Sequence, residues 1–160
     1  MLDSEQLVRD VALGRNHGFL EGDAQLGVGR FGNGLVLDGN GDYFEVPSFR
    51  GLFQDANFTL SAWIYNDSIG VDNDLQDAAI FSTNGNDLNT LLLWYDVNSV
   101  GTANRSFSFN LGSTAVSLNR INAPDSLAVQ NSWQHVVMVV NGDQHILYID
   151  GEEVVMTDFA

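Results

Sequence analysis

Residues 132–157 carry three strand-like runs separated by two tight-turn signals, and they constrain the fold more than any other segment. In His135–Val140 and His145–Ile149 the apolar side chains run almost without a break, as in strands covered on both faces. Asn141-Gly142 separates these runs and Asp150-Gly151 follows them, and both dipeptides tolerate the positive φ angles of a two-residue turn. The segment therefore predicts a β-meander of three antiparallel strands and an all-β fold.

The rest of the chain shows the same alternation of short apolar runs and turn residues. The whole sequence has 16 glycines but only two prolines. We expect strands at Phe58–Tyr65, Ala79–Ser82, Leu91–Tyr95 and Phe107–Leu111, and a hairpin that pairs Leu35–Leu37 with Tyr43–Val46. In FTLSAWIY the alternation places the side chains of Ser61 and Trp63 on the face opposite Ala62. Glu5–Ala12 is the one stretch that suits a short helix. No linker or repeat divides the sequence, so we expect one domain over residues 1–160.

The charge balance excludes some classes of partner. The chain has 21 acidic and 6 basic residues, no lysine, and a formal net charge of -15. Nucleic acids and anionic membranes attract clustered basic side chains, so neither is an expected partner. No run is apolar over the length that a bilayer requires, and the absence of cysteine excludes disulfides and thiolate zinc sites.

The sequence argues against catalysis. Glycosidases need two carboxylates a few ångströms apart, and no predicted strand carries acidic residues at alternating positions. The chain also lacks a nucleophile elbow, a phosphate-binding loop and a dinucleotide fingerprint. We therefore expect a protein that is not an enzyme.

Two acidic segments could bind a cation. Asp38-Gly39-Asn40-Gly41-Asp42 places oxygen-bearing side chains at alternate positions, although Tyr43 and Phe49 exclude an EF-hand. The alternative is a glycine-rich turn in which Asp and Asn are favoured for backbone reasons. The second segment is the loop Asn66–Asp77, with four aspartates, which either holds a hard cation or is simply solvated.

Several aromatic side chains could stack on sugar rings, namely those of Trp63, Tyr65, Trp94 and Tyr95. Most tryptophans of a two-layer sandwich fill its interior, so we expect Trp63 and Trp133 in the core. Trp94 is the better candidate for a binding site because it precedes a polar loop.

The order of segments resembles the laminin G-like, concanavalin A-like lectin/glucanase superfamily, in its bacterial and pentraxin-related branch. The matching stretches are Asn16-His17-Gly18, Gly29–Pro47, Phe58–Tyr65 and Trp133–Val154. The resemblance implies a jelly-roll sandwich of two antiparallel sheets, located outside the cell or on its surface. It also implies lectin-like binding of glycans or extracellular proteins, often in adhesion and often with calcium.

The resemblance suggests one more metal ligand, and the sequence differs from similar domains at its C-terminal end. Asp10 matches an Asp that precedes the Asn-His-Gly segment in similar domains, so it joins Asp38 and Asp42 as a candidate calcium ligand. Similar domains continue with further strands after LYIDGEEV, whereas this chain stops at Ala160. We therefore expect a C-terminally trimmed domain, or a sheet edge covered by another segment or subunit. An open edge invites pairing, which predicts a homo-oligomer.

Together these observations predict a non-catalytic, calcium-associated carbohydrate-binding or adhesion module. Trp94 and Tyr95 would stack on the sugar rings of the ligand. Asp72 and Asp74 would make polar or metal-bridged contacts with it. The alternative is a structural or protein-interaction module that self-associates through a sheet edge. A third interpretation is a non-catalytic appendage of a polysaccharide-degrading enzyme.

Overall fold

The computed structural model describes residues 7–49, 57–67, 78–83, 90–97, 105–112, 119–124 and 126–159. These residues form β-strands and one short 3-10 helix, without an α-helix, so the all-β prediction is confirmed. Within them, no helix has the length and apolar character needed to cross a membrane. The chain divides into two compact units, Met1–Leu52 and Phe53–Ala160, which are described separately below.

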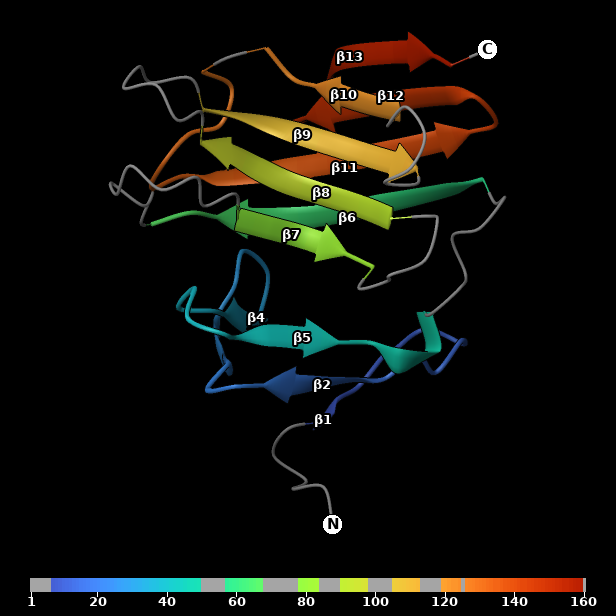
Figure 1. Ribbon diagram of the computed structural model, residues 1–160. Coiled ribbons are helices and arrows are strands. Elements are labelled where there is room, and N and C mark those ends of the chain that lie inside the picture. The colour runs from blue at the N-terminus through green and yellow to red at the C-terminus, as the bar shows by residue number, and fades with distance from the viewer. Residues whose placement is uncertain are drawn as a thin grey trace. The chain divides into compact units, whose positions relative to one another are not determined.

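In the second unit, the described residues form two four-stranded antiparallel sheets (Figure 1). The sheet with the order β13-β12-β11-β6 contains the predicted meander, and we call it the meander sheet. The other, which we call the facing sheet, has the order β10-β9-β8-β7. The strands are β6 (Phe58–Tyr65), β7 (Ala78–Ser82), β8 (Thr90–Val97), β9 (Arg105–Gly112), β10 (Asn119–Asn122), β11 (Trp133–Asn141), β12 (Gln144–Ile149) and β13 (Glu152–Asp158).

The meander forms as predicted, but its first turn begins one residue late. Ile149 pairs with Glu152, which leaves Asp150 and Gly151 as the loop, with φ angles of 52° and 87°. In the first turn Asn141 still pairs with Gln144, so the loop consists of Gly142 and Asp143. Only Gly142 of that pair has a positive φ, of 60°, which fits a turn with glycine at its first central position.

The core lies between the two sheets of this unit. Its buried side chains come from alternate positions of β9, β10, β11 and β12: Phe107, Phe109, Ile121, Val136, Met138, Val140, Leu147 and Ile149. Each such side chain contributes about 1.5–3 kcal/mol of burial free energy. The opposite faces of β11 and β12 are only half-buried, so the burial on both faces expected from their continuous apolar runs is not found.

A buried amide fixes the loop that leads into the meander. Gln134 is 5% exposed on the core face of β11. Its Oε1 accepts the backbone N–H of Val129 at 2.6 Å, and its Nε2 donates to the carbonyl oxygen of Leu127 at 2.8 Å. The polar group is therefore satisfied on both sides, and it ties residues 127–129 to β11.

The described residues of the first unit form five short strands in two sheets. One sheet has the order β1-β2-β5, and the other is the hairpin β3-β4. The elements are β1 (Leu7–Val8), β2 (Gly18–Glu21), β3 (Gln25–Val28), β4 (Asn33–Val36), β5 (Tyr43–Glu45) and the 3-10 helix η1 (Pro47–Phe49).

Two predictions for this unit are wrong. The strand around Leu35 pairs with β3, and the strand around Tyr43 pairs with β2, so these two do not form a hairpin with each other. Leu7–Val8 forms a strand beside β2 instead of part of a helix. The strands around Leu7 and Tyr43 both pair with β2, which the local pattern does not reveal, whereas β4 forms a local hairpin with β3.

Candidate functional site

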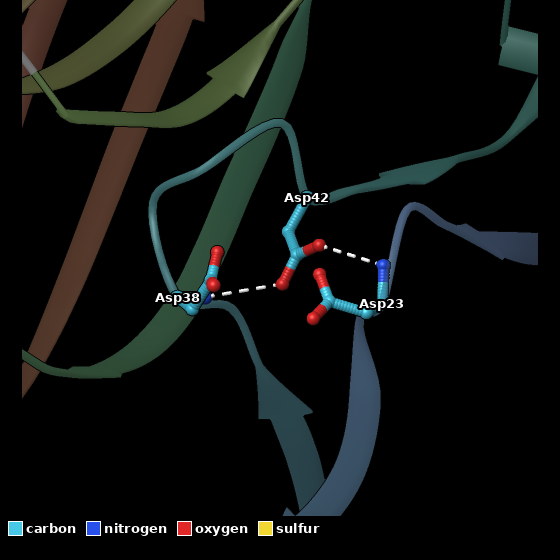
Figure 2. A group of neighbouring side chains, drawn as sticks. All are labelled: Asp23, Asp38 and Asp42. Atoms are coloured by element: carbon cyan, nitrogen blue, oxygen red, sulfur yellow. Dashed lines mark hydrogen bonds between the residues drawn. The ribbon is translucent and has the colours of Figure 1, made fainter.

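Three aspartates of the first unit come together where two turns meet (Figure 2). Asp23 lies in the connection between β2 and β3, and Asp38 and Asp42 lie in the connection between β4 and β5. One carboxylate oxygen from each residue lies within 4.8 Å of those of the other two. We call these three residues the acidic triad.

Backbone hydrogen bonds hold Asp42 at the centre of the triad. Its Oδ1 accepts the N–H of Asp23 at 2.9 Å, and its Oδ2 accepts the N–H of Asp38 at 3.1 Å (Figure 2). Asp38 in turn accepts the N–H of Asn40 at 2.7 Å. The loop is thus ordered by its own carboxylates, which is the turn chemistry expected of Asp in such a segment.

The carboxylates perturb one another. The N–H of Asp38 is the largest influence on Asp42, and it lowers the pKa of that carboxyl below its usual 3.8. A hydrogen bond with Asp42, together with the charges of Asp42 and Asp38, raises the pKa of Asp23 above 3.8. Carboxylates held this close repel one another, and binding of a proton or a cation between them relieves that repulsion.

The backbone at Gly22 leaves no space for a side chain. Its φ is +76°, and an added Cβ would lie 2.5 Å from Oδ1 of Asp42. Glycine is therefore required at this position for two reasons, the backbone conformation and the close approach of the carboxylate.

The donor set suits calcium, because a hard cation prefers several carboxylate and carbonyl oxygens in an exposed and adaptable setting. The structure brings together the predicted candidates Asp38 and Asp42. It adds Asp23, which the sequence reasoning missed. The signal for Asp23 was non-local, because the pairing of Glu21 with Tyr43 carries the two turns to the same end of the sheet.

Asp10 is not a member of the acidic triad. Its carboxylate accepts the N–H groups of Ala12 at 2.8 Å and Asn16 at 2.7 Å, and these bonds hold its pKa below 3.8. Its own N–H donates to Nδ1 of His17 at 3.0 Å. These contacts organise a local turn, and metal binding by Asp10 stays a prediction.

The predicted ligand-binding residues are less fully described. Asp72 and Asp74 lie outside the described residues. Trp94 and Tyr95 lie in β8, where their backbones pair with Ser108 and Phe107, and only the backbone of these two residues is described. Their role in binding stays a prediction.

The sequence predicted that Trp63 and Trp133 lie in the core, and this prediction is wrong for both. Trp133 is half-buried on the outward face of the meander sheet. Trp63 is 40% exposed on the same face. Its ring stacks on that of His135, with centroids 4.9 Å apart and an interplanar angle of 21°. The signal was present in the alternation of β6, which placed Trp63 on the same face as the hydroxyl of Ser61.

A second aromatic pair lies beside the first. Tyr65 is 47% exposed, and its ring lies 5.4 Å from that of half-buried Trp133, at an angle of 53°. Both pairs join cross-strand neighbours, since Trp63 faces His135 and Tyr65 faces Trp133 in the register of β6 and β11. The four rings therefore form one group on the outward face.

Comparison with known proteins finds similarity to a family and to a solved structure. The model of a family described as the concanavalin A-like lectin/glucanases superfamily matches residues 38–159. Comparison with curated proteins finds no match. Among solved structures, the chain is similar to domain 4 of AbnA, a GH43 extracellular arabinanase from Geobacillus stearothermophilus, in complex with arabinotriose. The TM-score is 0.56 at 14% identity, covering 88% of this chain and 65% of that chain, and this likeness shows a shared fold.

Proposed function

Because this chain belongs to the concanavalin A-like lectin/glucanases superfamily, we propose that it is a non-catalytic carbohydrate-binding module. The observation that carries the proposal is the likeness of its sandwich to a domain solved in complex with arabinotriose. A sandwich of this kind is a rigid scaffold from which loops and sheet faces present side chains to a ligand. Arabinan-type oligosaccharides are therefore the first ligands to test.

The charge of the chain narrows the ligand class. With a net charge of -15 and no lysine, the protein repels uronic-acid and sulfated polymers over the range of its electrostatic field. Neutral glycans carry no such penalty. The expected ligands are neutral oligosaccharides and polysaccharides.

Calcium is the proposed ion, and the acidic triad is its proposed site. Three carboxylates within 4.8 Å of one another repel, and a divalent cation would turn that repulsion into stabilisation. The exposure of these groups suits a weak site of the kind found in extracellular modules, with Kd of about 0.1–1 mM. This favours an extracellular or cell-surface location.

The same geometry argues for binding without catalysis. Glycosidases hold two carboxyl groups about 5–5.5 Å or about 6.5–9.5 Å apart on either side of the scissile bond. The oxygens of the triad are closer together, on exposed turns, with Asp42 held as an anion by backbone donors. That arrangement suits an ion better than a sugar between acid and nucleophile.

The proposal is tested by a glycan array and by calorimetry with arabinotriose and arabinan, each in calcium and in excess chelator. Binding of a neutral glycan is the expected result, and binding in neither condition would contradict the module. Calcium is tested separately by thermal unfolding, because an ion that binds the folded state raises the Tm by mass action. An Asp42→Asn variant should lose that rise, whereas Glu152→Gln, an exposed acid of β13, should keep it.

A further inference from the structure

The four rings on the outward face of the meander sheet, which we call the aromatic row, come from two neighbouring strands. Trp63 and Tyr65 belong to β6, and His135 and Trp133 belong to β11. We propose that the aromatic row is a glycan-binding site for neutral saccharides, with Trp63 as its main stacking surface. This inference rests on the proposed carbohydrate-binding function and assigns it to residues.

The aromatic row exposes large rings to solvent. Trp63 is 40% and Tyr65 is 47% exposed, although each has an apolar body that folding normally removes from water. Single exposed apolar side chains are ordinary on protein surfaces, but two neighbouring pairs of contacting rings on one face are not. A flat apolar group with polar neighbours matches a sugar ring, which has C–H faces and a rim of hydroxyls.

Contacts within the protein hold the row in place before any ligand arrives. Nε2 of His135 lies 2.7 Å from the hydroxyl oxygen of Ser61, and its ring stacks on Trp63. The backbone of His135 is fixed too, because its N–H donates to Oδ1 of Asp150 at 2.8 Å and its carbonyl accepts the N–H of Asp150 at 2.8 Å. A ring fixed in advance loses little conformational entropy on binding, which favours affinity.

The spacing of the two pairs suits an oligosaccharide. Trp63 and Tyr65 are two residues apart on one strand, a distance of about 7 Å along the sheet. An oligosaccharide lying along the strands would therefore cover both pairs. The row fits an extended chain of sugars better than a single monosaccharide.

Charge selects the class of saccharide. The protein carries a net charge of -15, and Asp150 holds the backbone of His135 at one end of the row. An anionic glycan would be repelled, whereas stacking of a neutral ring is insensitive to salt. Binding at the row is therefore expected to persist in high salt.

The test compares Trp63→Ala with Met156→Ala. Met156 is 52% exposed on the same face of the meander sheet, where it pairs with Ile146 on β12, away from the row. Affinity for arabinotriose, or for the neutral oligosaccharide that the array selects, is measured by calorimetry. The expected result is a loss of about tenfold or more for Trp63→Ala and a change within about twofold for Met156→Ala.

Two further measurements keep the result interpretable. Trp63→Phe retains a smaller ring, and it should bind with intermediate affinity even if Trp63→Ala fails to fold. In the wild-type protein, the bound saccharide should change the tryptophan fluorescence, and raising the salt concentration should leave the affinity unchanged.

The outcomes separate this inference from the function on which it rests. Equal affinities of wild type, Trp63→Ala and Trp63→Phe would overturn the site and leave the carbohydrate-binding function standing. Absence of binding by the wild type would overturn both. A Trp63→Ala variant that changes only self-association in sedimentation would identify the row as a contact between copies, and it would also overturn the site.

Discussion

Asp42 accepts the backbone N–H of Asp23 at 2.9 Å, although the two residues are 19 positions apart in the sequence. The contact exists because β2 and β5 pair, which places the turn after β2 beside the loop before β5. It ties two connections together and sets the spacing of the acidic triad. A change at either connection should therefore alter both the stability of the first unit and the calcium binding that we propose for the triad.

Gly22→Ala is expected to destabilise the first unit and weaken calcium binding. The φ of +76° costs a residue with a Cβ about 1–2 kcal/mol, and the Cβ would also push against Asp42. Gly142→Ala is the matched control, since Gly142 has a φ of +60° and no atom of the described residues lies within 4 Å of the added Cβ. Urea unfolding and calcium titration of both variants check the prediction; an unaltered calcium affinity in Gly22→Ala would contradict it.

His145 should make the second unit sensitive to acid. Its ring is 2% exposed between Phe109 and Phe159, at centroid distances of 5.5 and 4.8 Å, and its Nδ1 has no hydrogen-bond partner among the described residues. Burial lowers its pKa below 6.5, against the opposing charge of Asp143.

The buried, neutral ring of His145 should make the folded state less stable in acid. Below about pH 6.5 the unfolded chain binds a proton that the folded chain does not. The free energy of unfolding therefore decreases as the pH is lowered. His145→Leu should reduce the loss of stability between about pH 7.5 and about pH 5, whereas His135→Gln should retain it. Urea titrations at the two pH values measure this difference, and identical losses in wild type and His145→Leu would refute the role of His145.

Gln134→Leu is expected to lower the free energy of unfolding by about 1–3 kcal/mol. The substitution leaves the N–H of Val129 and the carbonyl of Leu127 without their present partner. Gln130→Leu removes a hydrogen bond from an exposed amide to the carbonyl of Asp67, and it should cost less than about 0.5 kcal/mol. Equal effects of the two variants would show that burial of the Gln134 amide does not matter.

The two methionines of the meander sheet should differ sharply. Met138→Ala removes a fully buried side chain from the core and should cost about 2–5 kcal/mol. Met156→Ala changes a side chain that is 52% exposed, and we expect a change within about 0.5 kcal/mol. Thermal unfolding of the two variants provides the measurement, and a small loss at Met138 would argue against a tightly packed core.

The sequence predicted those parts of the fold whose signal is local. β6 was predicted with its observed limits, and the meander was predicted with one turn displaced, because period-two alternation and Gly-containing turns are read within a few residues. The pairing of β2 with β5 was missed, since two short apolar runs around a glycine-rich loop look like a hairpin. Asp23 was missed for the same reason.

The aromatic side chains show a different failure. A general preference of tryptophan for sandwich interiors placed Trp63 in the core, although the alternation of β6 already put it beside polar residues. The local pattern was the better guide, because one face of a strand in a two-layer fold must point away from the interior. Asp72 and Asp74 lie outside the described residues, so their predicted role stays open to experiment.

The register of β13 has a consequence for how the protein behaves in concentrated solution. Leu147 pairs with Val155 and Tyr148 with Glu153, so the ladder skips Val154. The free backbone edge of this strand is therefore divided into two halves whose registers differ by one residue. Acidic side chains lie at both ends of the strand. An extended chain could form backbone hydrogen bonds with one half of β13, but it could not continue in the same register along the other half. β13 is therefore poorly suited to start the strand-by-strand growth of a fibril.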